Sequence, residues 1–193
     1  MKTIKNDTKN EIIIKNSRFI CYLYKIKDLN DISNYLTNIK NIEKDATHYC
    51  YAYIIDNNKK CSDDKEPSGT AGMPILNVLE KNNMNNVLCI VIRYFGGIKL
   101  GAGGLVRAYT NSVTTCLENN IVELKKGLKI EIIFSYDKTK IIDNLLKDYI
   151  IDKVFDDSVK YIILIDYELY KIINEKLKNM NIKINIIEEN IVI

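Results

Sequence analysis

The uneven placement of five residue types constrains the fold of this chain more than any other feature. Ile, Lys and Asn dominate the sequence, whereas Gly, Pro, Arg, Ala and His all fall between Ala46 and Ala108, apart from Arg18 and Gly127. Glycine and proline set special backbone angles, and guanidinium groups bind planar anions. We therefore expect the window from 46 to 108 to contain the tight turns, the close packing and the chemistry of the molecule.

Hydrophobic periodicity predicts the elements of the first two thirds of the chain. Residues 11–26 form two extended segments that pivot at Asn16 and Ser17, and apolar positions from 29 to 39 then recur at helical spacing. The runs HYCYAYII (48–55) and VLCIVIRYF (87–95) predict buried strands. Pro74 suits the first turn of a short helix, and a second helix is expected from about 105 to 119.

The pattern changes at Gly127, which marks the expected domain boundary. Beyond it the sequence predicts strand, helix, strand, strand, helix and strand, at residues 128–136, 141–149, 153–155, 159–167, 169–180 and 182–189. This βαββαβ order is typical of ferredoxin-like domains. The fold class is therefore α+β, with one domain at residues 1–127 and a ferredoxin-like domain at 128–193.

Composition narrows the class of protein. A hydrophobic content of 47% with 27% charged residues is typical of globular proteins. No apolar run approaches the roughly 20 residues that span a bilayer, and the first residues lack the apolar core of a secretory signal. We expect a cytoplasmic protein without membrane contact.

Cysteine and histidine usage argues against metal binding. The five cysteines stand far apart without a C-x-x-C pair, and His48 is the single histidine. Zinc sites need clustered ligands, and an odd number of scattered cysteines is typical of a protein in a reducing compartment. The sequence predicts no disulfide, no structural metal and no cofactor.

A glycine-rich segment joins the second buried strand to the second helix. Backbone N–H groups at such a junction can hold an anion, and three cations lie nearby. The spacing fits neither a P-loop nor a dinucleotide fingerprint, so a purely structural turn is the alternative. The candidate phosphate-binding or nucleic-acid-binding residues are Arg93, Gly96, Gly97, Lys99, Gly101, Gly103, Gly104 and Arg107.

The charge distribution is compatible with a polyanion contact in the first domain. Residues 1–127 carry 18 Lys and Arg against 13 Asp and Glu, whereas residues 128–193 carry 10 against 12. A solvated surface produces the same asymmetry.

An acidic loop precedes the helix at Pro74. Asp63, Asp64 and Glu66 offer carboxylates for Mg²⁺ or for acid and base catalysis. The alternative, which we favour, is a solvated turn in which Ser68 and Thr70 satisfy the free N–H groups of the helix.

His48 with Asp45 and Ser68 also contains the residue types of a hydrolase triad, although G-x-S-x-G is absent. The candidate catalytic residues are His48, Asp63, Glu66 and Ser68.

Four segments together resemble the signatures of the YigZ/IMPACT family. They are SRFICYL, DATHYCYAYII, SDDKEPSGTAGMPILNVL and VIRYFGGIKLGAGGLVRAYTNSV, which cover most of residues 17–113. The resemblance implies a first domain like the second domain of ribosomal protein S5, and a second domain like a late, ferredoxin-like domain of elongation factor G. Lys65 stands where the pattern has glycine, and Met73 where a lysine or arginine is frequent.

The resemblance favours a non-enzymatic cytoplasmic factor linked to translation, which would bind RNA or ribosome-associated protein partners through residues 93–107. One alternative is an enzyme that acts on a phosphorylated small molecule or nucleotide, using the same glycines and the acidic loop 63–66. A second is a protein-interaction module without nucleic acid. Arg93 has a structural alternative as well, an ion pair with Asp63 or Glu66.

Overall fold

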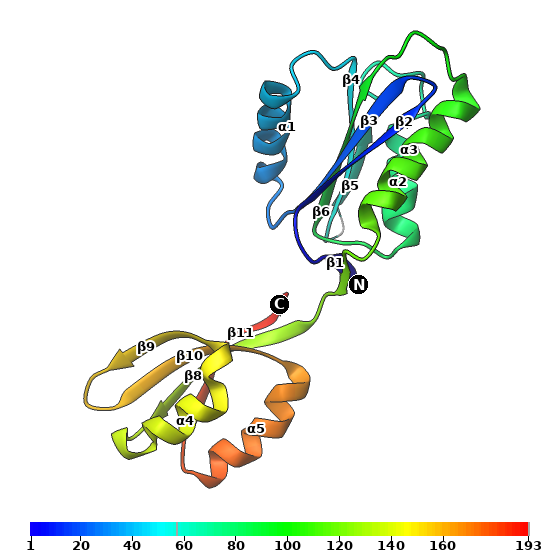
Figure 1. The fold of residues 1–193 in the computed structure, drawn as a ribbon. Helices are drawn as coiled ribbons and strands as arrows, with labels where there is room; N and C mark the ends of the chain where they lie inside the picture. Colours follow the sequence, from blue (N-terminus) through cyan, green and yellow to red (C-terminus); the bar gives the residue numbers. More distant parts are fainter. Residues whose placement is uncertain (57, 193) are drawn as a thin grey trace. The chain divides into compact units, whose positions relative to one another are not determined.

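The computed structural model describes residues 1–56 and 58–192, and its contacts divide the chain into two compact units (Figure 1). Unit 1 is Met1–Glu123 and unit 2 is Leu124–Ile193. Each unit combines sheet and helix, so the fold is α+β. The expected boundary residue, Gly127, lies inside a strand of unit 2. Within the described ranges, no helix has the length and apolar character needed to cross a bilayer.

Unit 1 is built on a five-stranded antiparallel sheet in the order β2-β3-β6-β4-β5, and a separate two-stranded ladder pairs β1 with β7. One helix, α1, covers one face of the larger sheet, while α2 and α3 cover the other (Figure 1). The elements are β1 (Lys2–Ile4), β2 (Thr8–Ile14), β3 (Ser17–Lys25), α1 (Asn30–Ile42), β4 (His48–Ile55), β5 (Asn58–Ser62), α2 (Gly72–Lys81), β6 (Val87–Tyr94), α3 (Ala102–Leu117) and β7 (Ile121–Glu123).

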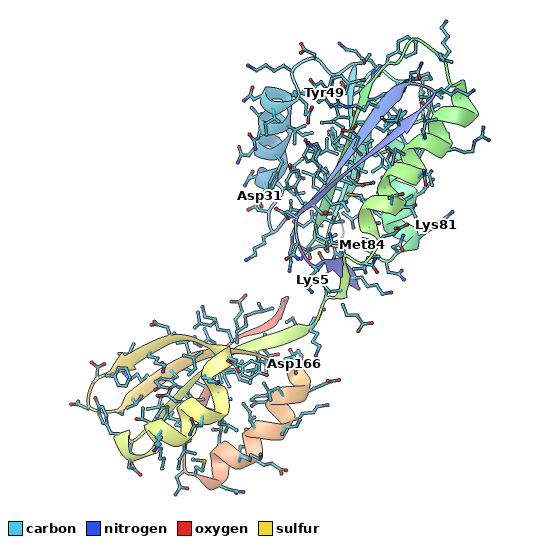
Figure 2. All side chains as sticks on the ribbon, in the orientation of Figure 1. Lys5, Asp31, Tyr49, Lys81, Met84 and Asp166 are labelled. Atoms are coloured by element: carbon cyan, nitrogen blue, oxygen red, sulfur yellow. The ribbon has the colours of Figure 1, made fainter. Side chains whose placement is uncertain are left out.

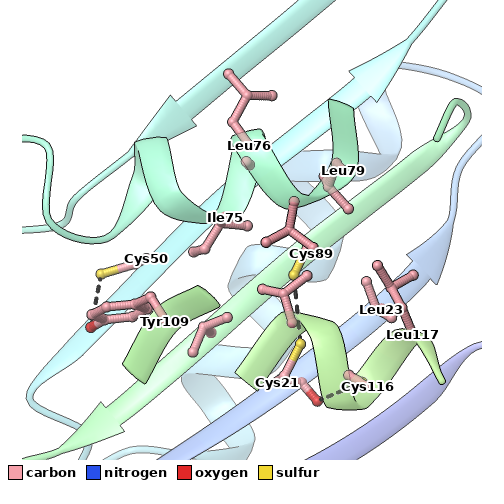
Figure 3. Packing of buried hydrophobic residues seen from close by; sticks show 14 of the residues in the cluster. Cys21, Leu23, Cys50, Ile75, Leu76, Leu79, Cys89, Tyr109, Cys116 and Leu117 are labelled. Atoms are coloured by element: carbon pink, nitrogen blue, oxygen red, sulfur yellow. Dashed lines mark hydrogen bonds between the residues drawn. The ribbon is translucent and has the colours of Figure 1, made fainter. Parts of the chain in front are cut away.

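The alternation of side chains across the sheet produces two cores. Cys50, Ala52 and Ile54 of β4 join the core beneath α2 and α3 (Figure 3), while Ile90 and Ile92 of β6 belong to the core beneath α1. Residues one apart on a strand point to opposite faces, so the central strands β3, β4 and β6 each contribute to both cores. The near-continuous apolar sequence of β6 follows from burial on both of its faces.

Most of the predicted elements of unit 1 are present, but Phe95 lies outside its strand, and strands β1, β5 and β7 were not predicted. The sequence placed Phe95 at the end of a buried strand, but β6 ends at Tyr94 and Phe95 is 48% exposed. Strand β5 was not predicted, because the segment NKKCS is polar and lies at the edge of the sheet. The turn between β2 and β3 lies one residue earlier than expected, at Lys15 and Asn16, both of which have positive φ, and Ser17 already belongs to β3.

Unit 2 has the element order βαββαβ, apart from two single 3₁₀ turns, and the sheet order β11-β8-β10-β9. Both helices pack on one sheet, and side chains fill the space between them (Figure 2). The elements are β8 (Lys126–Phe134), η1 (Tyr136–Lys138), α4 (Thr139–Leu146), η2 (Lys147–Tyr149), β9 (Ile150–Phe155), β10 (Val159–Asp166), α5 (Tyr167–Asn179) and β11 (Lys183–Val192). This order is the split βαβ plan that the sequence predicts.

Candidate functional site

The connection from β6 to α3 is held tightly against the turn between β2 and β3. A Cβ added at Gly96 would lie 2.0 Å from the carbonyl carbon of Asn16, so only glycine fits there. The Gly96 N–H donates to Ser17 Oγ at 3.2 Å. Further along, Gly101 has a φ of 71° at the N-cap of α3, a conformation that also favours glycine.

Helix α3 begins without a capping side chain. None of the described residues caps it, its first turn contains no acidic residue, and the Leu105 N–H makes the first intrahelical bond, to the Gly101 carbonyl. The N–H groups ahead of that bond and the helix dipole together favour an anion.

This helix end opens on a cavity of about 360 Å³, the α3 cavity, whose lining includes Glu66, Arg93, Phe95, Lys99, Gly101 and Ala102.

Arg93 is held in place by protein groups. Its side chain is 6% exposed, and Nη1 donates to Glu66 Oε1 at 2.7 Å. Its guanidinium carbon lies 5.5 Å from the ring centroids of both Phe19 and Phe95. Nε has no hydrogen-bond partner in the described part of the chain. The ion pair with Glu66 that the sequence allowed is therefore formed, and it neutralises this guanidinium locally.

Glu66 is the centre of a buried polar network. The Tyr109 hydroxyl donates to Glu66 Oε1 at 2.9 Å, and His48 Nε2 lies 3.8 Å from the same oxygen. His48 Nδ1 lies 2.8 Å from the Asp64 carbonyl oxygen, which can only accept, so Nδ1 carries the proton. The imidazole is thus fixed with Nε2 toward the carboxylate.

Cys50 extends this network into the core. Its thiol donates to the Asp63 carbonyl at 3.0 Å and lies 3.3 Å from the Tyr109 hydroxyl (Figure 3). Burial raises the pKa of Cys50 to about 12. The thiol is therefore neutral near pH 7, and a neutral thiol is a poor nucleophile.

Asp63 caps helix α2, a role that the sequence assigned to Ser68 and Thr70. Its carboxylate accepts from the backbone N–H groups of Gly69, Ala71 and Gly72 at 2.8–2.9 Å. Burial acts to raise the pKa of Asp63, but these three hydrogen bonds outweigh it and hold the pKa below its usual range. The expectation for Ser68 and Thr70 was wrong. The Asp63 carboxylate accepts from the N–H groups at the start of the helix, and the Thr70 hydroxyl donates to the Pro67 carbonyl instead.

The remaining catalytic candidates do not assemble. In the described part of the chain, neither Asp45 nor Ser68 makes a hydrogen bond or ion pair with His48, whose partners are Asp64 and Glu66. Asp64 instead accepts from the Tyr49 backbone N–H at 2.7 Å. Among residues 1–56 and 58–192, no three His, Cys, Asp or Glu side chains converge as metal ligands. The structure brings His48 and Glu66 together, and among the described residues Ser68 makes no hydrogen bond with either.

Lys99 and Arg107 differ from Arg93 in their exposure. Both lie on the surface, Lys99 at the α3 cavity and Arg107 at a neighbouring cavity of about 500 Å³ that Lys15 also lines. Leu100 borders both cavities. Arg107 was expected in the first turn of the helix but lies in the second, because α3 already begins at Ala102.

Several residues of the site carry no recognisable sequence signal. Ser17, Cys50 and Tyr109 reach the network from three different elements, and contacts of such sequence separation leave no periodic pattern. Lys65, in contrast, has a sequence signal, because the family pattern has glycine at this position. Its φ of 69° lies in the region that glycine adopts most easily.

The fold and site define a two-domain α+β protein with an uncapped helix end above a buried ion pair. A model described as the Impact N-terminal domain matches residues 15–117. This chain belongs to the IMPACT family.

The chain is similar to IMPACT family member YvyE of Bacillus subtilis, with 45% identity over 131 residues that cover 66% of this chain and 60% of that protein. It is 36% identical to an IMPACT family member of Haemophilus influenzae, over 70% of this chain and 69% of that protein. A solved structure described as the crystal structure of an hypothetical protein superposes with a TM-score of 0.64 at 26% identity, covering 97% of both chains. The matched segment thus spans less than two thirds of the YvyE protein.

Proposed function

We propose that this protein is a non-enzymatic cytoplasmic factor, linked to translation, that binds RNA through the α3 cavity and the neighbouring cavity at Arg107. The observation that carries the proposal is the uncapped N-terminus of α3, which opens on a cavity beside the exposed amine of Lys99. The one carboxylate lining this cavity, Glu66, is already paired with Arg93. The link to translation rests on the resemblance to the YigZ/IMPACT family alone.

The three cations of the proposal differ in their exposure and in their protein contacts. Lys99 and Arg107 are exposed and have no ion-pair partner within residues 1–56 and 58–192, whereas Arg93 is engaged by Glu66 and Ser17. Phosphate contacts position a nucleic acid without reading its sequence. We therefore expect binding that depends on salt and is tolerant of sequence.

The test substitutes Lys99→Ala and Arg107→Ala in the full chain and measures RNA affinity over a range of salt concentrations. Each substitution removes one phosphate contact, so each should weaken binding uniformly across sequences and reduce the slope of log K against log salt by about 0.7–0.9. Lys60→Ala, which alters an exposed lysine of the edge strand β5, serves as the matched control and should leave the slope unchanged. Unchanged affinity in both folded variants, or no RNA binding by the unaltered protein at low salt, would reject the proposal.

A second candidate function involves His48, which does not itself line the α3 cavity but lies beside Glu66, which does. His48 is oriented with Nε2 toward Glu66, an arrangement that suits a general base acting on a phosphorylated small molecule or nucleotide. Asp63 and Asp64 are both engaged by backbone N–H groups, so the acidic loop supplies no free pair of carboxylates for Mg²⁺. Binding of mononucleotides or phosphate monoesters in the absence of RNA binding would favour this candidate.

A further inference from the structure

An exposed aromatic ring borders the α3 cavity. Phe95 is 48% exposed and lines the cavity together with Lys99 and Ala102. Strand β6 ends one residue earlier, so this ring leaves the sheet at the point where the loop begins. Single exposed apolar side chains are common on protein surfaces, and exposure alone therefore assigns no role.

Two contacts hold Phe95 in place, one made by its backbone and one made by its ring. The Phe95 backbone N–H donates to Thr47 Oγ1 at 3.1 Å. The guanidinium carbon of Arg93, itself buried and bonded to Glu66, lies 5.5 Å from the centroid of the ring. A ring that is already held in place loses little conformational entropy when a ligand contacts it.

This surface combines a cationic part, formed by the N-terminus of α3 and Lys99, with the apolar ring of Phe95, and a nucleotide has a chemical group that fits each part. Its phosphate would lie against the N–H groups of α3 and the Lys99 amine, and its base would lie against a flat apolar ring. The faces of a base in a duplex are covered by its stacked neighbours, so the ring can accept only an unpaired base. Sequence-tolerant binding of single strands combines these two elements, a cationic surface and aromatic stacking.

We propose that Phe95 is a stacking platform for an unpaired base of single-stranded RNA whose adjacent phosphate occupies the α3 cavity. The inference rests on the proposed RNA binding and narrows its substrate class to single strands. The phosphate contacts alone predict neither a role for Phe95 in binding nor a preference for single-stranded over double-stranded RNA.

The test replaces Phe95 in the full chain and measures the affinity for short single-stranded RNA. Phe95→Ala should weaken binding roughly tenfold without changing the salt slope, because stacking is lost while the phosphate contacts stay. Phe95→Leu should show a similar loss, and Phe95→Trp should retain or increase affinity. Ile98→Ala removes another exposed apolar side chain of the same loop and is the matched control, for which we expect no change.

The chain contains no tryptophan, so Phe95→Trp also introduces a single fluorescent reporter at the site. Its emission should be quenched by single-stranded RNA, and not by an abasic ribose-phosphate strand or by a duplex of the same length.

Failure of the inference is distinguishable from failure of the proposed function. If salt-dependent RNA binding persists but Phe95→Ala binds as the unaltered protein does, or if duplex binds as tightly as single strand, stacking at Phe95 is rejected and RNA binding stands. If the unaltered protein binds no RNA, both proposals fall. Melting temperatures of all variants establish that each one is folded.

Discussion

The buried pair of Arg93 and Glu66 joins the end of β6 to the acidic loop and to α3. Glu66 also accepts from Tyr109, and both paired side chains are at most 6% exposed. Removing one member of such a pair leaves the other charge buried without a counter-charge. The resulting loss in the free energy of unfolding is far larger than the net stabilisation that the pair itself provides. The network therefore fixes the position of the loop from which Phe95 and Lys99 extend.

We expect Arg93→Ala to lower the free energy of unfolding of unit 1 by about 3–5 kcal/mol, because it leaves the Glu66 carboxylate buried and without its cation. Urea denaturation followed by tyrosine fluorescence measures the loss. Lys59→Ala is the matched control, since Lys59 pairs with Glu80 on the surface and its loss should cost no more than about 1 kcal/mol. The double variant Arg93→Met with Glu66→Leu should recover much of the stability, and a loss below about 1 kcal/mol for Arg93→Ala would contradict a structural role for the pair.

The candidate site could be predicted from the sequence only in part. The glycine-rich junction and its cations were predicted because glycine and arginine are rare in this chain outside one window. The partner of Arg93 was narrowed to Asp63 or Glu66, and the structure selects Glu66 because Asp63 is bound to the N-terminus of α2. Phe95 was missed because an apolar run does not reveal the residue at which its strand ends.

At the scale of elements, the loop from β6 to α3 is positioned by contact with the turn between β2 and β3. The glycines of this loop and of the first turn of α3 are not equivalent. Gly96 lies against the Asn16 backbone, whereas a Cβ added at Gly103, inside α3, would meet nothing within 4 Å. One glycine is required by close packing and the other is not.

Gly96→Ala should therefore destabilise unit 1 by more than about 2 kcal/mol, because a methyl group there overlaps the Asn16 carbonyl and forces the backbone apart. Gly103→Ala, the matched control, should be neutral or stabilise by up to about 1 kcal/mol, since alanine is the better helix former. Thermal or urea denaturation of both variants provides the comparison. Equal stability of the two would contradict the close contact at Gly96.

The elements that periodicity predicts are those whose packing is regular. Strands β4 and β6 and helices α3 and α5 bury an apolar pattern along most of their length, and each was expected close to its observed bounds. The ladder of β1 with β7 and the edge strand β5 are short or polar. Their pairing comes from hydrogen bonds to a neighbouring strand, which a period in the sequence does not encode.

At the scale of the whole molecule, each unit buries apolar side chains of its own, in two cores in unit 1 and in one core in unit 2. Separate cores are the physical condition for separate folding. Strand β7 pairs with β1 and belongs to unit 1 although it follows α3, so a fragment that lacks it would lose the ladder at the N-terminus.

We predict that the fragment 1–123 folds without the rest of the chain. It should show a single cooperative unfolding transition, because the five-stranded sheet and all three of its helices are complete within it. Calorimetry of the fragment tests this, with the fragment 124–193 measured alongside. A fragment 1–123 without a cooperative transition would show that unit 1 depends on residues beyond it.

The ladder of β1 with β7 has a consequence for how this kind of protein is assembled in evolution. Lys2 pairs with Glu123, so the chain enters and leaves unit 1 at neighbouring points of one ladder. A segment with adjacent ends can be joined to new sequence on either side, or inserted into another gene, without pulling its sheet apart. The family match at residues 15–117 falls inside this unit, which is thus suited to be inherited as a module.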